Sequence, residues 1–599
     1  MKVGRITRVD GVRVVATFYE RLQPFLITNE DIVTSPRINS FVKTNIGLDT
    51  VICQIVGEHE IEYGKGEGSL GEHQEPQGPF QVDLEVRGYL SNGIFKSGLR
   101  SLPIVGGVVE TLNRNDLSLL HDSNVPHAMV LGNDLFDESS LVEINANHLM
   151  AGHIGIFGNT GSGKSNTLAK VLREYALQFD RKSDKARVIV FDLNNEYGGD
   201  AVIPFDEKAV FSLNTRQPKK SNKIPFCIKD LDDDNWGTLL RATQKTQMPV
   251  VTRAYKRWKD FDDGELINRL KWDLVDKRVT AFHTLRNYCK DYFVGLDDLA
   301  FNSNPGCETF YYQPWSAGNY INSIGDVKAI ALKPDLTEFE IFYICLAYEV
   351  ARSAESGTNF DYVQPLLPRA KQIIKDLNKV FENSEAEGLN GLFSNSNFVV
   401  VQLGNTNADT RNIIPALLVE LLFDEAVEAK GDGKPSFITT AVIDEAHNLL
   451  SYDSAQNDLV HDNTLRVFEK VIKEGRKFGL FLCAASQRPS DISPTITSQL
   501  HNFFIHKLVN PNDIERIRKT VSFMGDSSLS MLSALGQGEC ILTGPALHMP
   551  QYIYVHQLER EYKPNSDDVI IFGKEGLIKK RRLKKKNNPA GSAPDEDIN

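Results

Sequence analysis

The chain has 599 residues, of which 41% are hydrophobic and 24% charged, and its formal net charge is -12. This length predicts about three to five structural units, and the composition is that of an ordinary globular protein. No apolar run approaches the ~20 residues that cross a bilayer, and the negative charge repels nucleic acid unless a local basic surface receives it.

The ends of the chain and its cysteines predict a cytoplasmic protein. Residues 1–5 lead directly into strand-like sequence, without the apolar segment of a secretory signal. The seven cysteines contain no CxxC pair, which argues against a zinc site and a disulfide framework. Residues 579–586 are strongly basic, and we interpret them either as a solvated tail or as a non-specific phosphate contact.

Residues 1–110 are expected to form a small β-barrel. Strand-like runs at residues 12–18, 50–56 and 80–86 are separated by turns and by a loop at 63–79 that is rich in Gly, Glu and Pro. A plain β extension of the following domain is the alternative.

Apolar strands that alternate with amphipathic helices follow from about residue 145, which predicts a parallel α/β sheet. A strand at residues 153–157 leads to a helix at 165–179. Further strands are predicted at 187–193, 398–403, 437–443, 480–486, 503–508, 539–542 and 552–556.

The intervening sequence divides this α/β core in two. Residues 205–385 have helical patterning, for example at 337–354, and are predicted to form a subdomain inserted into the core. The predicted domains are thus the barrel at 1–110, the core at 111–204 and 386–562, the insertion at 205–385, and a tail at 563–599.

The strongest motif is GxxxxGK[ST] at residues 158–165, between an apolar strand and a helix. Glycines let backbone N–H groups surround phosphates at a helix N-terminus, where the dipole favours anions. Lys164 can reach the β- and γ-phosphates of ATP, and Ser165 can ligate magnesium. The predicted nucleotide-binding residues are Gly158, Asn159, Thr160, Gly161, Ser162, Gly163, Lys164, Ser165 and Asn166.

Two acids follow the apolar strand at residues 437–443, where hydrolysis requires a carboxylate for magnesium and another for water. Asp444 is the predicted magnesium carboxylate and Glu445 the predicted base. A strand that merely ends at a solvated acidic turn is the alternative.

Four more polar residues are candidates near the same sheet edge or at a subunit boundary. Asp192 and Glu196 follow the second strand and could assist at the metal or the water, although a turn cap explains Asp192 almost equally well. Gln487 ends another strand and could contact the γ-phosphate. Arg476 is a candidate arginine finger for a neighbouring subunit, or else a surface arginine that closes a helix.

These motifs together resemble the HerA family of ATPases, within the wider HerA and FtsK group of DNA translocases. The resemblance rests on residues 153–167, 192–197, 442–448, 474–480 and 486–490, and it extends to residues 4–18, which resemble the family's N-terminal barrel. This chain departs from the usual pattern of the family at residues 192–196. It has Asp-Leu-Asn-Asn-Glu there in place of the more usual Pro-His-Gly-Glu ending.

The resemblance implies an α/β RecA-like P-loop core and a homo-hexameric ring of the bacterial type. Double-stranded DNA would pass through the ring, and ATP and Mg²⁺ would bind between its subunits. It also implies a nuclease or another effector, for example a sirtuin-like NADase, on the barrel face, in DNA-end processing or in an antiviral defence operon.

Two functions stay open on the sequence. One is an ATP-driven DNA translocase or helicase, and the other is an ATP-bound ring scaffold that activates an effector with little translocation. A coupling ATPase for conjugation shares the core, but such proteins are usually anchored in a membrane, and no anchor is expected here.

Overall fold

The structure of the chain, a computed structural model, describes most of the sequence. The described residues are 1–19, 25–27, 32–60, 80–113, 116, 119–120, 126–136, 140–179, 185–305, 307–314, 319–328, 330–384, 389, 391–430, 433–452, 459–521 and 524–565. The predicted loop at 63–79, the basic run at 579–586 and nearly all of the predicted tail lie outside them.

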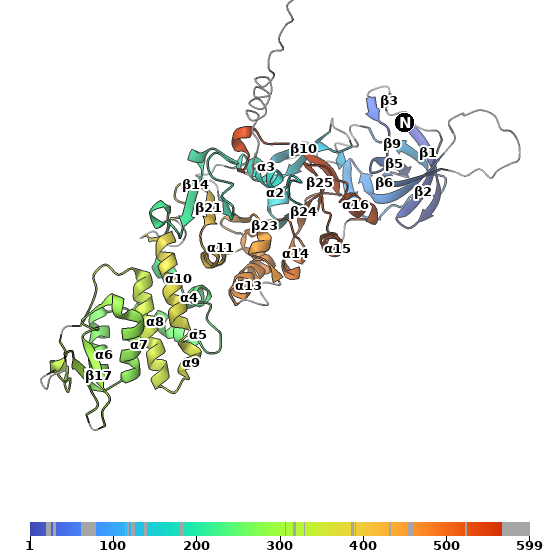
Figure 1. Cartoon of the computed structure of the whole chain (residues 1–599). Coiled ribbons are helices and arrows are strands. Elements are labelled where there is room, and N and C mark those ends of the chain that lie inside the picture. Colours follow the sequence, from blue (N-terminus) through green and yellow to red (C-terminus); the bar gives the residue numbers. More distant parts are fainter. Residues whose placement is uncertain are drawn as a thin grey trace, which may run out of the picture. The chain divides into compact units, whose positions relative to one another are not determined.

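The N-terminal residues form a closed antiparallel barrel, drawn in blue in Figure 1, which confirms the prediction. In the described part of the chain its strands follow the order β2-β1-β9-β5-β6-β7, and β7 pairs again with β2. Side chains alternate along these strands, so that every second residue of β2 faces the interior. The strands are β1 (Lys2–Asp10), β2 (Arg13–Phe18), β5 (Phe41–Ile46), β6 (Asp49–Glu60), β7 (Phe80–Ser91) and β9 (Val108–Thr111), and β8 (Ile94–Ser97) extends the sheet beside β7.

An 11-stranded sheet, counted over the described residues, forms the centre of the α/β core, with the order β11-β10-β26-β25-β24-β12-β23-β22-β13-β21-β14. The strands from β24 to β14 run parallel, and those from β25 to β11 are antiparallel. The parallel strands are β24 (Asn502–His506), β12 (Ile154–Phe157), β23 (Leu480–Ser486), β22 (Ile438–Ile443), β13 (Ala186–Asp192), β21 (Phe398–Asn405) and β14 (Ala209–Asn214). The others are β25 (Glu539–Thr543), β26 (Gln551–Val555), β10 (Ala128–Asp134) and β11 (Leu141–Asn145).

The register of the parallel strands brings their carboxyl ends together. Phe157 of β12 lies opposite Ser486 of β23, and Ile443 of β22 lies opposite Phe191 of β13. The loops that follow these four strands therefore leave the sheet at one edge, which is where ligands bind in open α/β sheets.

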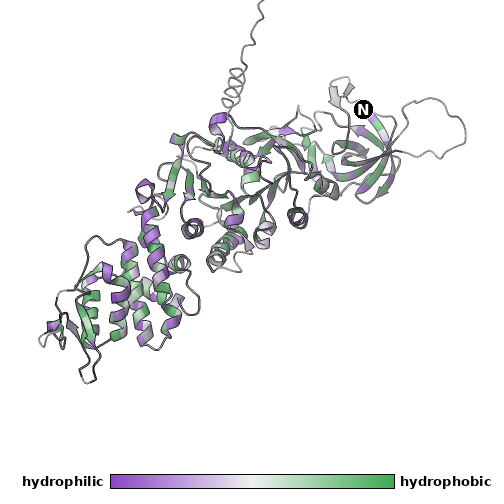
Figure 2. Cartoon of the chain, viewed as in Figure 1, coloured by the Kyte–Doolittle hydropathy of each residue, from purple (hydrophilic) through white to green (hydrophobic). Residues whose placement is uncertain are grey.

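Helices cover the sheet because each buries one apolar side. The strands of the large sheet are mostly green, that is hydrophobic, in Figure 2, whereas the helices carry both green and purple residues. Helix α3 (Lys164–Ala176) follows the P-loop and is slightly shorter than predicted, and α11 (Ala408–Glu428) and α13 (Leu459–Glu474) pack on each other. The α/β architecture with its P-loop is as the sequence predicts.

A largely helical insertion separates β14 from β21. Its helices are α4 (Asp233–Leu240), α5 (Met248–Lys259), α6 (Asp263–Val275), α7 (Val279–Cys289), α8 (Glu338–Glu355), α9 (Phe360–Val363) and α10 (Leu366–Val380). In its centre Trp236 stacks on Phe342 with ring centroids 3.5 Å apart.

The predicted start of the insertion at residue 205 requires a correction. Residues 209–214 form β14, which pairs with β21 at the edge of the large sheet. The chain then leaves through β15 (Ile224–Phe226) and returns through β20 (Phe381–Asn383), and these two short strands pair in parallel.

Candidate active site

The phosphate loop joins β12 to α3 and is fixed by its neighbours. Gly161 and Gly163 have φ values of 76° and 108°, a region that L side chains rarely adopt. A Cβ on Gly158 would lie 2.5 Å from Cβ of His506, so only glycine fits there. The backbone N–H of Gly538, in the turn before β25, donates to the carbonyl of Ser162 over 2.9 Å and holds the loop in place.

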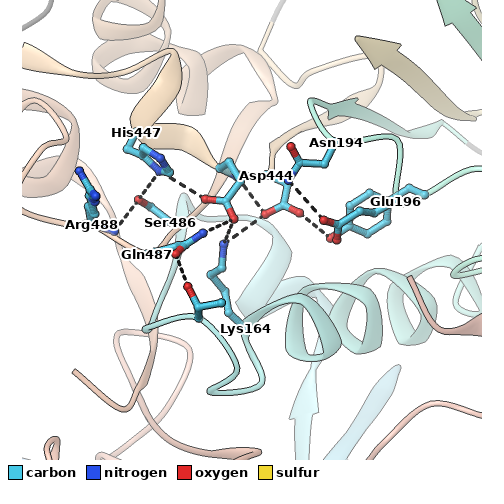
Figure 3. A network of polar contacts seen from close by, with 11 residues as sticks. Lys164, Asn194, Glu196, Asp444, His447, Ser486, Gln487 and Arg488 are labelled. Atoms are coloured by element: carbon cyan, nitrogen blue, oxygen red, sulfur yellow. Dashed lines mark hydrogen bonds and ion pairs between the residues drawn. The ribbon is translucent and has the colours of Figure 1, made fainter. Parts of the chain in front are cut away.

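Lys164, the first residue of α3, points to the paired acids at the end of β22 (Figure 3). Its Nζ donates to Oε1 of Glu445 over 2.9 Å and lies 3.5 Å from Oδ1 of Asp444. All three side chains are largely buried. The ammonium group thus neutralises two carboxylates that would otherwise repel each other.

Glu445 is held as a charged carboxylate in this network. Burial alone raises its pKa, but the charge of Lys164 and the hydrogen bonds from Lys164 and Gln487 outweigh burial and leave the pKa below its ordinary value. Its φ of 52° is a left-handed backbone conformation, which is costly for a residue with a side chain. Such strain is frequent where a side chain must be aimed at a ligand.

Gln487 connects the phosphate loop to Glu445. Its Nε2 donates to Oε1 of Glu445 over 2.9 Å, while its Oε1 accepts from Oγ1 of Thr160 over 2.5 Å. A change at either end of this amide is therefore transmitted to the other. On the far side of Glu445, Nδ1 of His447 lies 3.4 Å from Oε2 and 3.3 Å from Oγ of Ser486.

The turn after β13 supplies the other side of the site. The carboxylate of Asp192 accepts from the backbone N–H groups of Glu196 and Tyr197, each over 2.9 Å, so Asp192 caps this turn. Tyr197 then reaches back and donates its hydroxyl to Oδ2 of Asp444 over 3.0 Å. Burial, followed by the charge of Asp444, raises the pKa of Glu196 to about 7.

The structure brings together the residues that the sequence assigned to hydrolysis within one chain. Thr160, Lys164, Asp444, Glu445 and Gln487 form one continuous network. Ser165 stands beside Lys164 in the first turn of α3.

Asn166 contacts the segment after β26. Its side chain donates to the carbonyl of His556 and accepts from the backbone N–H of Leu558, each over 3.2 Å. The side chain therefore anchors the segment after β26, and nucleotide binding by Asn166 stays a prediction.

Arg476 lies far from the site of its own chain. It is an exposed residue of the turn η7 (Gly475–Phe478), just before the amino end of β23, and its Nη1 lies 3.3 Å from Nε2 of His501. The seven residues of β23 separate it from Ser486 by about 20 Å at ~3.3 Å per residue. If Arg476 contributes to hydrolysis, it does so in another subunit.

The sequence assigned no role to Tyr197, His447 or His506. Tyr197 directly follows Glu196 and His447 stands two residues after Glu445, but only the turns after β13 and β22 show that they face the acids. His506 is fully buried under the phosphate loop, and burial lowers its pKa to about 4. No sequence motif predicts these contacts.

The donor set fits ATP with magnesium. The loop offers backbone N–H groups and one lysine for phosphates, and Ser165 and Asp444 offer the hard oxygen atoms that Mg²⁺ prefers. Mg²⁺ usually keeps water and phosphate oxygens as its other ligands, so one hydroxyl and one carboxylate suffice on the protein side.

Residues 129–301 match the family model described as the central domain of the helicase HerA. A protein of Methanocaldococcus jannaschii described as a probable helicase is 22% identical over 99% of this chain and 97% of its own length. A protein of Sulfurisphaera tokodaii described as the DNA double-strand break repair helicase HerA is 24% identical over 78% of this chain and 76% of its own.

Among solved structures, VirB4 of Thermoanaerobacter pseudethanolicus aligns with a TM-score of 0.39 and 14% identity, over 73% of this chain and 98% of its own. The bacterial conjugative coupling protein TrwB aligns with a TM-score of 0.41 and 12% identity, over 76% and 94%. No helix in the described part of this chain is both long and apolar enough to cross a membrane. The matched central-domain model and the alignment along nearly the whole chain show that the chain is similar to the HerA helicases and is an ATP-hydrolysing enzyme with a P-loop.

Proposed function

We propose that the protein is an ATP-driven hexameric translocase or helicase for double-stranded DNA that works with a nuclease or another effector. The observation that carries the motor part of this proposal is the network from Thr160 through Gln487 and Glu445 to Lys164. It links the phosphate loop to a charged base, which nucleotide binding alone does not require.

The residues divide the work of hydrolysis between them. Lys164 exchanges its contact with Glu445 for the β- and γ-phosphates, which frees Oε1 of Glu445 to take a proton from the attacking water. Gln487 remains next to this carboxylate and to Thr160, where it orients the water against the γ-phosphate. Ser165 and Asp444 would hold magnesium, which would supply positive charge next to the transferred phosphoryl group.

The position of Arg476 supports a ring. An arginine that lies on the opposite edge of the sheet from its own phosphate loop serves hydrolysis only if a second copy presents its loop there. The hexamer, the duplex and the effector on the barrel follow from the family resemblance, and the M. jannaschii and S. tokodaii relatives, which are described as helicases, support the action on DNA. A bacterial antiviral setting and a cytoplasmic location stay predictions.

One surface of the insertion suits the phosphate backbone of DNA. A groove of about 630 Å³ is lined by Arg253, Lys256, Arg257, Arg269 and Arg352, together with Asp260, Asp262, Glu265 and Glu349. Two of the four acids are already paired, because Glu349 holds Arg257 over 2.7 Å and Glu265 holds Arg269. The lining thus has five basic and four acidic residues, and its basic members include exposed Lys256 and half-buried Arg352, in a chain whose net charge is negative.

ATPase assays on the purified assembly test the motor. Lys164→Ala removes the phosphate contact and should abolish nucleotide binding and hydrolysis, whereas Glu445→Gln should retain nucleotide and lose turnover by at least about 100-fold. Duplex DNA should raise the rate of the unaltered protein. If neither duplex nor single-stranded DNA raises turnover, alone or with the co-purifying effector, the motor proposal fails.

The same Glu445→Gln protein separates a motor from a scaffold. A scaffold requires only the ATP-bound ring, so the variant would still activate its effector. A motor requires turnover, so effector activity on long DNA should fall with the ATPase rate. Effector activity that survives without hydrolysis would favour the scaffold.

A further inference from the structure

Tyr197 is fixed at three points although the chemistry described so far does not use it. Its backbone N–H donates to Asp192 over 2.9 Å, and its carbonyl accepts from Nζ of Lys208 over 3.0 Å. Its hydroxyl donates to Oδ2 of Asp444 over 3.0 Å, and the residue is only 1% exposed. A phenol this firmly placed cannot leave Asp444 without unravelling the turn.

The turn itself is built to present this side chain. Asn195, with φ of 63°, accepts from the backbone N–H of Gly404 over 3.0 Å, which ties the turn to the end of β21. Gln402 of β21 donates to Asp192 over 3.3 Å and accepts from Oγ of Ser212 of β14 over 2.5 Å. Polar contacts across three neighbouring strands therefore converge on the turn that carries Tyr197.

The contact from Tyr197 determines how Asp444 is oriented. Oδ2 is engaged by the phenol, while Oδ1 accepts from the backbone N–H of Glu445 over 2.9 Å and lies 3.5 Å from Lys164. Without the phenol, the plane of the carboxylate could turn about the Cβ–Cγ bond, because this terminal torsion has a broad range of allowed angles. A neutral donor also suits this position, since a second cation would compete with magnesium for the carboxylate.

We propose that Tyr197 is a positioning residue for the proposed ATPase reaction, which holds the Asp444 carboxylate in the orientation that receives magnesium. The buried hydroxyl is a neutral donor that points directly at this carboxylate. The inference rests on the proposed function, because it concerns the metal used with the nucleotide.

Binding of a fluorescent ADP analogue to the full-length protein, with and without MgCl₂, tests the proposal without turnover. Tyr197→Phe keeps the buried ring and removes one hydrogen bond to a charged group. It should reduce the gain in affinity that magnesium provides roughly tenfold, while the affinity without magnesium stays the same. Lys208→Met removes the donor to the Tyr197 carbonyl. It should also reduce the gain in ADP affinity from magnesium, but by less than Tyr197→Phe does.

Tyr343→Phe is the matched control. Tyr343 is also fully buried, and among the described residues its hydroxyl has no hydrogen-bond partner, so this variant should bind ADP with and without magnesium as the unaltered protein does. A loss of thermal stability in Tyr197→Phe without a change in the magnesium gain would mean that the phenol only supports packing, and would overturn the proposal.

A double-mutant cycle shows whether Tyr197 acts through Asp444. Asp444→Asn should itself lose most of the increase in ADP affinity that magnesium provides. Adding Tyr197→Phe should then reduce that increase no further. A further tenfold loss in the double variant would overturn the proposal. If Lys164→Ala leaves ADP binding intact, the proposed function fails instead, whatever Tyr197 does.

Discussion

Gln487 donates to Oε1 of Glu445 over 2.9 Å, the same oxygen that accepts from Lys164. In the proposed mechanism, binding of the γ-phosphate would draw Lys164 away, and Gln487 would then become the main partner of the base. Because its other end accepts from Thr160, the amide is positioned to sense whether the phosphate loop is filled.

Gln487→Leu should therefore separate nucleotide binding from hydrolysis. The leucine fills similar space but removes both amide contacts, so kcat should fall by about 10- to 100-fold, while the affinity for ATP changes little. Steady-state kinetics combined with binding of a non-hydrolysable ATP analogue measure the two effects separately. Equal losses in binding and in kcat would contradict a role that is specific to hydrolysis.

Arg476 and Lys164 should complement each other between subunits. Rings of Arg476→Ala alone or of Lys164→Ala alone should each have little ATPase activity. When the two variants are mixed and reassembled in equal amounts, about a quarter of the interfaces combine an intact Lys164 with an intact Arg476, and activity should return in proportion. Mixed rings with no recovered activity would exclude a finger acting in trans.

Glu196 should make the nucleotide-free protein less stable as the pH rises. Burial and Asp444 raise the pKa of Glu196 to about 7, so the folded chain keeps its proton where the unfolded chain, with a value near 4.5, has lost it. Stability is therefore lost as the pH rises from about 4.5 to about 7 and stays reduced above that. Glu196→Gln should remove this slope and be more stable at pH 8 by about 1–2 kcal/mol, allowing for partial solvent screening.

Thermal unfolding of both proteins at pH 5.5 and pH 8 checks this. The exposed Glu382 of β20 provides a control, and Glu382→Gln should leave the pH profile of the unaltered protein in place. If the thermal stability of the unaltered protein and that of Glu196→Gln changed with pH in the same way, Glu196 would have an ordinary affinity for its proton.

The basic groove of the insertion should contribute to DNA affinity. Lys256→Glu combined with Arg352→Glu reverses two charges there and should weaken duplex binding at least about tenfold, while the ATPase rate without DNA is unchanged. The slope of log K against log salt should also decrease by about two, one for each lost phosphate contact. Fluorescence anisotropy over a range of salt concentrations gives both numbers.

Lys375→Glu with Lys290→Glu is the matched control for charge. Both lysines are exposed on the insertion but do not line the groove. If the control weakens DNA binding as much as the groove variant, the effect is one of net charge. If only an effector protein is lost from the groove variant, the surface recognises that protein and not DNA.

The sequence could predict the parts of the site that are local along the chain. The P-loop is one continuous segment whose glycines, lysine and serine have fixed roles, so the residues around Lys164 follow from the motif and its flanking strand and helix. Asp444 and Glu445 were predictable in the same way, because a buried strand ends immediately before them.

The contacts that depend on turns could not be predicted. The hydroxyl of Tyr197 reaches Asp444 only because the Asp192 cap reverses the chain after β13. Helical patterning also gave the insertion an early boundary at 205, since β14 is a short edge strand whose assignment depends on its pairing with β21. Long-range pairing of this kind leaves little trace in local periodicity.

The insertion leaves the core through β15 and returns through β20, and because the two strands pair, its ends stand one strand spacing apart, about 4.8 Å. A segment of more than 150 residues thus leaves and re-enters the ATPase core at one place, and its helices α4 and α10 also contact α11 of the core. Such a segment can be lengthened, shortened or exchanged without altering the register of the sheet beneath it, so the proposed DNA-binding groove could change while the ATPase site stays the same.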